Sequence, residues 1–403
     1  MTAHERPKTI TPYAAAAMVA TAWFLLSVAS YFLLAIPREH RFDFYPRWVG
    51  ARAAIVGDTP YSEEVTTRIQ EGMFGRRLEP AEDQHGFAYA PGVIWLLLPF
   101  WLLPFGAAIS IWCGLQLLVM FLSCLVVASL LGWRVSPISL AAILLLSTLI
   151  YRYPINAYLL GQFIPFCMAC LVAGWWGLAH GKPVIASVAL IMSLIRPEVV
   201  VLPLIGLLVI AWRMNYRSVV WAWTAAIAVL WLLTRARIGA WEADFVAGLV
   251  RYQAYSSPVW PPGLVGSMWL ALMIVVAVSV WSVWMWSELA ILTYSERAGW
   301  VISGASLAGL VIFPQTGNYT LILGLLAVWM FLWVSRPYYS RWLLVVPVLS
   351  SPWFFFSAGH GLYLWERLLI PVFLMGLLTL GWHLRKAAIS NEDANLQVNR
   401  SET

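Results

Sequence analysis

The stretch LQLLVMFLSCLVVASLL, residues 115–131, decides the fold class of this chain. It contains no charged residue, and the run IPVFLMGLLTLGW at 370–382 has the same character. Strands of a membrane barrel would alternate apolar and polar residues with period two. Continuous apolar runs instead predict α-helices, because a helix satisfies its own backbone hydrogen bonds in lipid.

Composition extends this prediction to the whole chain. Of its 403 residues, 61% are hydrophobic and only 11% are charged, whereas a soluble domain has roughly 25% charged residues. We therefore expect an all-α polytopic integral membrane protein with little room for a soluble domain. The net charge of +6 reflects basic cytoplasmic loops rather than a nucleic-acid partner. All cysteines lie in apolar runs and suit packing rather than metal binding: Cys113, Cys124, Cys167 and Cys170.

The distribution of Lys and Arg predicts the topology. Residues 1–12 form a basic, cytoplasmic N-terminus, and the apolar run that follows is too long for a signal peptide. A membrane domain spans 13–390 with about 11–13 helices. Residues 391–403 are polar and predicted to be a disordered cytoplasmic tail. The segment 92–106, split by prolines, fits either a re-entrant hairpin or a short tilted span.

Basic, short connections are predicted to be cytoplasmic, which places the intervening loops outside. The cytoplasmic set is His180/Lys182, Arg213/Arg217, Arg336/Arg341 and Arg385/Lys386. The external set is 37–90, 153–162, 196–198, 236–264, 313–318 and 351–366.

The first external loop, 37–90, is predicted to be ordered. YPRWVGARAAIVG (45–57) interleaves apolar residues with arginines, which favours a short amphipathic helix at the membrane surface. SEEVTTRIQEGMF (62–74) favours a second helix, capped by Ser62 and acidic in its first turn. GDTPY (57–61) is typical of the turn between them.

Polar residues gather on the predicted external face, several of them at the ends of spans. An ionisable residue at such a depth is a functional candidate, although ordinary interfacial anchoring is the alternative. The candidates are Asp43, Arg52, Asp58, His85, Tyr89, Gln162, Arg196, Glu198, Gln315, Asn318, His360, Glu366 and Arg367.

Four segments in order carry a resemblance to a known family. They are DFYPRWVGARAAIVGDTPY (43–61), FAYAPGVIWLLLPFWLLPFGAA (87–108), GQFIPF (161–166) and MSLIRPEVVVLPL (192–204). The chain resembles the bacterial membrane glycosyltransferases of family 87, which have the GT-C fold. The likeness covers roughly the N-terminal half and fades after residue 215. Ala90 replaces a proline of the family pattern, and Arg196 replaces a lysine.

The resemblance implies sugar transfer from a polyprenyl-phosphate donor, with a hexose such as mannose, to a lipid or glycan acceptor. The active site would face outward from a bacterial plasma membrane, and the displacement would be inverting. No cofactor or metal is expected. The alternatives from other classes are a transporter or flippase for a lipid-linked or amphipathic substrate, and a non-catalytic membrane partner.

This chemistry assigns roles to particular residues. Asp43 is the expected base, since the resemblance places one in the first loop, although it could also cap the following helix or pair with Arg41 or Arg47. Arg196 is the expected phosphate ligand, because guanidinium matches phosphate oxygens, and its alternative is an ion pair with Glu198. Arg52 is a second phosphate candidate. Gln162 suits sugar hydroxyls or helix–helix hydrogen bonding.

The remaining candidates are weaker. Asp58 is explained by turn chemistry, and Arg367 by interfacial anchoring. The segment FPQTGNYT (313–320) departs from a His-containing turn that the family often has, so Gln315 and Asn318 stand where a histidine is expected. The predicted substrate-binding set is Gln162, Asp58, Tyr89, Glu198, Gln315, Asn318, His85 and Arg367.

Overall fold

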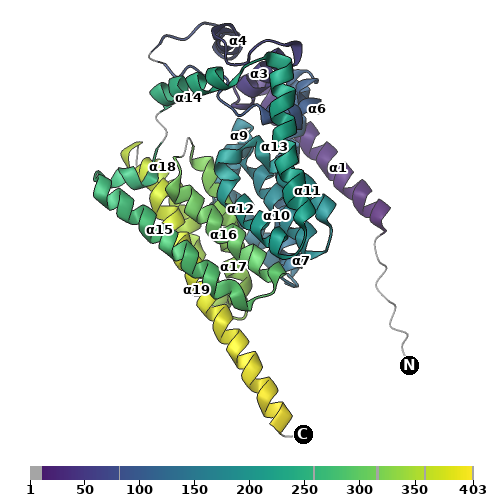
Figure 1. The fold of residues 1–403 in the computed structure, drawn as a ribbon, viewed down its shortest axis with the longest axis vertical. Helices are drawn as coiled ribbons and strands as arrows, with labels where there is room; N and C mark the ends of the chain where they lie inside the picture. Colours follow the sequence, from purple (N-terminus) through teal and green to yellow (C-terminus); the bar gives the residue numbers. More distant parts are fainter. Residues whose placement is uncertain (1–10, 81, 257–258, 315–316, 358–359, 402–403) are drawn as a thin grey trace.

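The computed structural model describes residues 11–401 except 81, 257–258, 315–316 and 358–359, and the elements in that part of the chain are helical (Figure 1). The N-terminal helices are α1 (Pro12–Ser30), α2 (Ile36–Arg38), α3 (Phe44–Val56), α4 (Glu63–Phe74), α5 (Gly92–Leu96), α6 (Leu98–Trp101), α7 (Phe105–Leu130), α8 (Pro137–Leu145), α9 (Tyr153–Leu160) and α10 (Ile164–Ala179). The others are α11 (Pro183–Met192), α12 (Pro197–Arg213), α13 (Arg217–Ile238), α14 (Glu242–Ser256), α15 (Met268–Glu288), α16 (Tyr294–Ile312), α17 (Leu325–Ser335), α18 (Val345–Ser357) and α19 (His360–Ser401).

Short helical segments join several of these. The 3-10 helix η6 (Asn318–Gly324) precedes α17, and π-helical segments η1 (Tyr31–Ala35) and η2 (Leu146–Ile150) continue α1 and α8.

Within the described residues, six helices are long and apolar enough to cross a membrane, or seven if the bent pair Pro137–Ile150 and Tyr153–Leu160 is one span. The expected architecture of a multi-pass helical membrane protein is thus supported. The number of described helices that are long and apolar enough to cross is smaller than the expected 11–13. The physical reason is that several apolar stretches form helices that are short or broken. For example, Pro183–Ile195 is too short to count, and the bent pair turns by 63° at its break.

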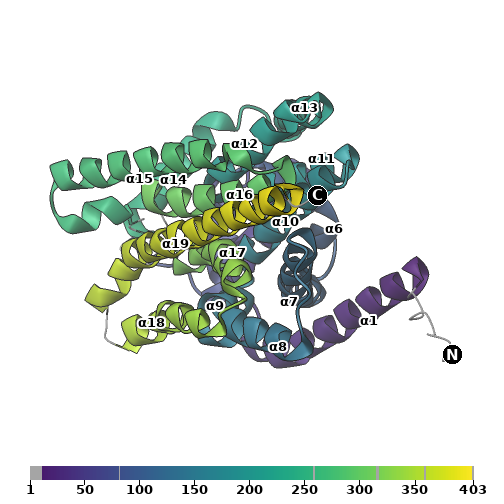
Figure 2. The ribbon, with the colours of Figure 1, turned by 90° about the horizontal axis from the view of Figure 1, so that it is seen from below.

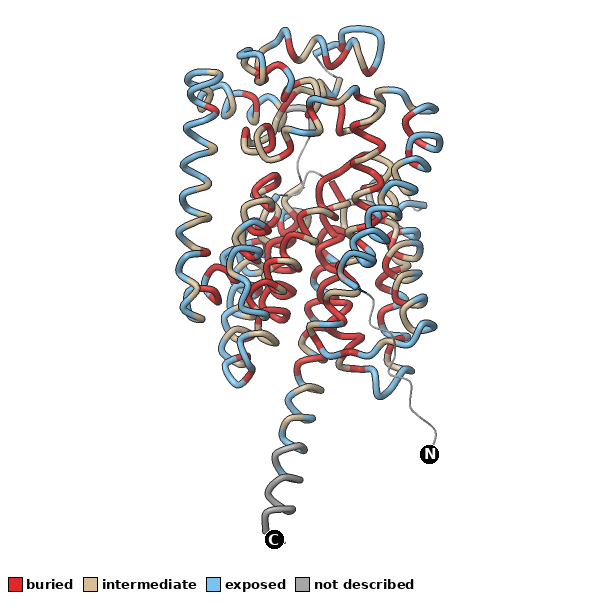
Figure 3. Tube along the Cα trace, turned by 90° about the vertical axis from the view of Figure 1, so that its right-hand side faces the viewer, coloured by how far each residue is buried: buried red, intermediate tan, exposed pale blue. Residues whose placement is uncertain are grey.

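Outer helices expose apolar surface in the way that lipid contact requires. Figure 2 shows α1, α13 and α15 around the outside and α10, α16 and α17 inside. In the 18-residue apolar stretch of each helix, only 17% of the residues are buried in Tyr13–Arg38 and 11% in Arg217–Ile238. In Asn318–Ser335 the buried share is 89%. Figure 3 shows the buried residues concentrated in the interior. A soluble protein rarely exposes such large apolar surfaces.

The first loop and the last described turn of α19 lie at opposite ends of the molecule. Helices α3, α4 and α14 gather at one end, here called the loop end, and α19 ends far from it. Ion pairs tie α19 to α15 and α16 away from the loop end, with Lys386 Nζ 2.8 Å from Glu288 Oε2 and Arg385 Nε 2.9 Å from Glu296 Oε1. Two loops predicted to lie on the same side, 37–90 and 236–264, therefore share the loop end, since they contain α3, α4 and α14.

The two helices predicted in the first loop are confirmed. Helix α3 ends at Gly57, whose φ of 106° lies in the left-handed region that favours glycine. The Ser62 hydroxyl accepts a hydrogen bond from the Val65 amide at 3.2 Å and begins α4. Segment 57–61 connects the two helices, as the turn chemistry predicts.

Two other segments sharpen or change the expectation. Residues 92–106 form the short helices α5 and α6 and the start of α7 rather than a spanning helix, because prolines interrupt helical hydrogen bonding. Helix α19 continues to Ser401, through most of the tail predicted to be disordered. Adding residues to an existing helix avoids the cost of nucleation, so a polar tail can extend it.

Helix α1 packs closely against α7 at a glycine. A Cβ atom on Gly114 would lie 2.7 Å from the backbone nitrogen of Ser27, closer than real contacts allow. Gly376 in α19 has no such neighbour within 4 Å and faces outward.

We expect Gly114→Val to destabilise the protein by about 1–3 kcal/mol, because overpacking forces two helix backbones apart. Gly376→Val is the matched control and should leave the midpoint of thermal unfolding in detergent nearly unchanged. Equal midpoints for the two variants would contradict the packing described here.

Candidate active site

Asp43 stands at the start of α3, between the first span and the first-loop helices. It is the residue that precedes α3, but its side chain makes no capping hydrogen bond. Instead, the half-buried carboxylate accepts a hydrogen bond from the side-chain amide Nε2 of Gln162, far away in sequence. Burial raises the pKa of the Asp43 carboxyl, and the nearby charge of Arg47 opposes this rise. The capping alternative is therefore not the arrangement found.

Gln162 is the centre of the site. It follows Gly161, which ends α9 with a left-handed φ of 67°, and its side chain is completely buried. Its amide nitrogen donates to Asp43, while its amide oxygen accepts from Arg47 Nη2 at 3.0 Å and from Arg196 Nη1 at 3.3 Å. One neutral amide thus holds a carboxylate on one side and two guanidinium groups on the other, each matched by polarity.

Arg47 is the functional candidate that the sequence reasoning missed. Its side chain is only 1% exposed and lies between two aromatic rings, 4.3 Å from the centre of Tyr89 and 4.4 Å from that of Phe163. Nη1 donates to the Asp43 carbonyl oxygen at 2.9 Å. Within the described residues, the buried Nε has no acceptor. The available signal was its position four residues after Asp43, which puts both on one helix face.

Arg196 reaches the same amide from the start of α12. It is 5% exposed, and its Nε donates to Glu198 Oε1 at 2.7 Å. Arg196 therefore forms the ion pair with Glu198 and also belongs to the cluster around Gln162. The Tyr319 ring lies 5.9 Å from the Arg196 guanidinium carbon. Each of the two guanidinium groups uses two N–H groups in the bonds described.

Tyr89 covers Arg47 and closes one side of the cluster. Burial raises the pKa of its hydroxyl to about 12, although the charge of Arg47 opposes the rise, so the hydroxyl stays a hydrogen-bond donor at neutral pH. The charge of His85 also acts on the Asp43 carboxyl and lowers its pKa, which places His85 within electrostatic reach. His85 itself lies 3.9 Å from the Asp83 carboxylate.

Two predicted residues lie apart from this cluster. Arg52 is exposed, stacks on Trp48 with 4.7 Å to the ring centre, and donates to the Trp101 carbonyl at 3.2 Å. Asp58 forms an exposed ion pair with Arg68 at 3.4 Å, as its position in a turn suggests. Neither makes a hydrogen bond to the cluster within the described residues. Gln315 lies outside the described residues.

Asn318 and Arg367 form a second, adjoining cluster. Arg367 Nε donates to the Asn318 side-chain oxygen, and both residues are buried. The neighbouring Glu366 is fully buried, near the charges of Arg152 and Arg367. Because Asn318 and Tyr319 both belong to η6, this short helix touches both clusters. Arg367 is thus a buried residue rather than an interfacial anchor.

Two separate hollows lie along α12 and α16. A hollow of about 40 Å³ is lined by Arg196, Glu198 and Gly309, among others. Farther along the same two helices, a groove of about 200 Å³ is lined by Leu202, Gly206 and Ala305 and is closed by tryptophans of α15. We call this the α12–α16 groove. The smaller hollow thus adjoins the polar cluster, and the α12–α16 groove lies farther along the same helices.

The cluster can perform acid–base and anion chemistry. It combines a carboxylate of raised pKa with two buried cations that are not bonded directly to it. In the described residues, no group of three or more His, Cys, Asp or Glu side chains is arranged to hold a metal ion.

Comparisons with known proteins found no similarity to this chain: no protein-family model, curated protein or solved structure matches it.

The raised pKa of Asp43 predicts how stability changes with pH. Below about pH 3.9, the ordinary value for Asp, the carboxyl is protonated in both states. As the pH rises, the unfolded chain releases this proton first, and the folded protein loses stability until the pH passes the raised pKa. Asp43→Asn removes this loss. We expect its melting temperature to exceed that of the wild type by an amount that grows from about pH 4 upward and then levels off.

Differential scanning fluorimetry in detergent across this pH range measures the difference. A difference that stays constant or shrinks with rising pH would contradict a carboxyl whose ionisation is disfavoured by burial.

Proposed function

We propose that this protein is a membrane glycosyltransferase that moves a hexose from a polyprenyl-phosphate donor to a hydroxyl of a lipid or glycan acceptor. The observation that carries the proposal is the Gln162 amide with its three charged partners. An acidic group of raised pKa stands beside two buried guanidinium groups, at the end of the bundle that carries the first loop. The resemblance of four sequence segments to glycosyltransferase family 87 points the same way.

In the proposed reaction, Asp43 accepts the proton of the acceptor hydroxyl. The hydroxyl oxygen attacks the anomeric carbon of the donor sugar, and the bond between that carbon and the phosphate oxygen breaks. A carboxyl with a pKa raised toward the working pH suits a general base. Inversion at the anomeric carbon follows from the class that the sequence resembles.

Arg47 and Arg196 stabilise the polyprenyl phosphate as it leaves. Guanidinium groups donate to phosphate oxygens in pairs, and low surrounding dielectric strengthens such contacts. Gln162 fixes the distance between the cations and the base. The polyprenyl tail lies in the α12–α16 groove, whose apolar lining lies farther along the helix that follows Arg196.

A transporter or flippase of a lipid-linked substrate is the second candidate, and the same groove favours it. It would bind the headgroup at the cluster and pass it across the bilayer without forming a bond. Its requirement would be the cations and the groove, with Asp43 dispensable.

The decisive experiment incubates the purified protein with radiolabelled polyprenyl-phosphate-mannose and an acceptor lipid extract. We expect Asp43→Asn to reduce transfer by about 10²–10⁴-fold, the usual contribution of a general base. Equal transfer by variant and wild type would exclude the proposed base. If neither protein transfers any lipid-linked hexose, while vesicles containing the wild type move the intact donor lipid between leaflets, the transporter is favoured.

A matched pair of arginines on α3 tests the phosphate site. Arg47→Gln should lower transfer by about 10²–10³-fold, as expected for loss of a donor that stabilises charge in the transition state. Arg52→Gln should stay within about threefold of the wild type, a change below 1 kcal/mol in activation free energy, because Arg52 is exposed and separate from the cluster. Steady-state rates under the same conditions measure both. A larger loss for Arg52→Gln would restore Arg52 as the phosphate ligand.

A further inference from the structure

We propose that a polar pocket in the first loop binds the carbohydrate part of the acceptor as a neutral, polyhydroxyl ligand. The pocket has a volume of about 520 Å³, within the usual range of ligand sites, about 300–1,000 Å³. Its walls come from residues 59–62, α4, Arg77, residues 84–88 and α14. We call it the loop pocket. The identification of its ligand as the acceptor depends on the proposed function, whereas sugar binding does not.

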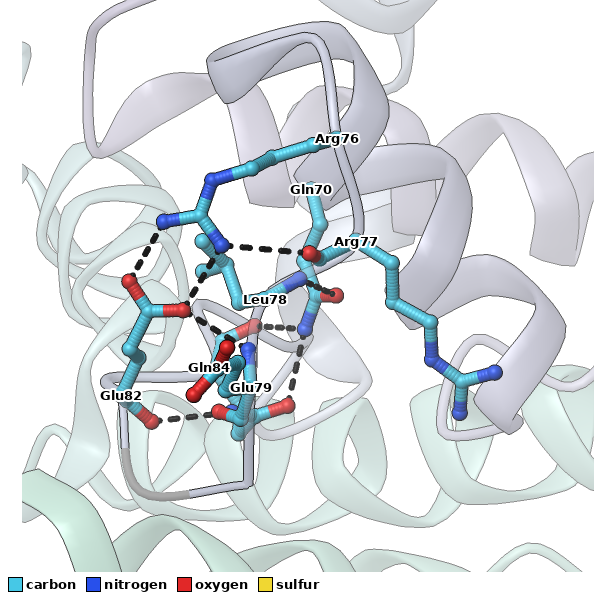
Figure 4. A network of polar contacts seen from close by, with 7 residues as sticks. All are labelled: Gln70, Arg76, Arg77, Leu78, Glu79, Glu82 and Gln84. Carbon is cyan, nitrogen blue, oxygen red and sulfur yellow. Dashed lines mark hydrogen bonds and ion pairs between the residues drawn. The ribbon is translucent and has the colours of Figure 1, made fainter.

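One wall of the loop pocket is built by a hydrogen-bond network around Gln70 (Figure 4). Gln70 is 1% exposed. Its amide nitrogen donates to the backbone and side-chain oxygens of Gln84, both at 3.0 Å, and its oxygen accepts from the Leu78 amide at 2.9 Å. Arg76 donates to both carboxylate oxygens of Glu82 and so holds these two residues together. A wall ordered before binding reduces the entropic cost of holding a ligand.

The lining offers neutral hydroxyl groups from Thr59, Ser62, Thr66 and Thr67. Three of these make one internal hydrogen bond each and keep further donor or acceptor capacity, whereas the Gln70 and Gln84 amides are used within the wall. Sugar hydroxyls both donate and accept, so a mixed lining of this kind matches them.

Charge in the loop pocket is balanced, which disfavours a phosphate. Its two cations already have partners, because Arg77 pairs with Glu63 and Arg251 donates to the Tyr61 carbonyl oxygen at 3.0 Å. Asp244 adds a second carboxylate. A phosphate would meet paired cations and nearby acids, whereas a neutral sugar can use the oxygens and N–H groups of both.

An aromatic column connects the loop pocket to the Asp43 cluster. The Tyr61 and Phe87 rings line the pocket and lie 5.5 Å apart, and Phe87 lies 5.4 Å from the Tyr89 ring. Tyr61 also donates to the Tyr89 carbonyl oxygen at 2.8 Å. Since Tyr89 covers Arg47, these three rings lie between the loop pocket and the Asp43 cluster.

Gly248 on α14 allows the loop pocket to be filled. It lines the pocket, and a Cβ atom there would meet Tyr61 at an ordinary 3.5 Å. Gly248→Phe and Thr67→Trp should both occupy the cavity, while Gly248→Ala adds one methyl group and is the control.

Binding of neutral manno- and gluco-oligosaccharides to the purified full-length protein in nanodiscs is measured by saturation-transfer NMR titration, without donor. We expect binding by the wild type and Gly248→Ala, and at least about tenfold weaker binding by both filling variants. Inorganic phosphate should not compete. Thermal unfolding midpoints identify a variant that fails to fold, and the other filling variant then decides. Unchanged binding by a folded filling variant, no binding of any neutral oligosaccharide, or effective competition by phosphate would overturn the proposal.

The transfer assay separates this proposal from the proposed function. If Asp43→Asn transfers hexose normally but the filling variants lose sugar binding, the proposed mechanism fails and the pocket stands. If Asp43→Asn loses transfer but the filling variants bind sugar normally, the pocket fails and the proposed mechanism stands.

Discussion

The hydrogen bonds of the Gln162 side-chain amide are the interaction on which the site depends. Its two ends have opposite polarity, so it can face a carboxylate and two guanidinium groups at once. Both Arg47 and Arg196 are nearly inaccessible to solvent, and unpaired buried charges cost several kcal/mol each. The amide brings Asp43 and Arg47 of the first loop together with Arg196 at the start of α12, and Arg196 is also paired with Glu198.

Aromatic rings supply the rest of the stabilisation. Arg47 lies between Tyr89 and Phe163, and such cation–π contacts are worth about 2 kcal/mol or more when water is excluded. The same Tyr89 belongs to the aromatic column that reaches the loop pocket. The Tyr89 side chain therefore contacts both the aromatic rings of the first loop and the buried Arg47 guanidinium.

The bilayer sets the wider frame. Outer helices such as α1 and α13 leave apolar side chains exposed, because lipid rather than protein covers them, while α17 is enclosed by other helices. The Asp43 cluster lies at the loop end, where α3, α4 and α14 gather. Helices α12 and α16 extend through both environments, with the small hollow beside Arg196 at one end and the apolar α12–α16 groove farther along. A molecule with a charged head and an apolar tail matches this gradient.

The sequence by itself determined the helical membrane class, the capped helix α4 and the turn at 57–61, because each depends on local pattern. It also indicated Asp43, Gln162 and Arg196 one by one, as polar residues beside apolar runs. Only the tertiary structure decided that these three meet, because their contacts join residues more than thirty positions apart. The choice between Arg47 and Arg52 likewise depended on which side of α3 packs against the bundle. Both arginines fit an amphipathic helix, and a periodic pattern alone does not state which face is buried. Span number was equally undetermined, because the bend after α8 and the length of α11 arise from packing and proline positions rather than from hydropathy.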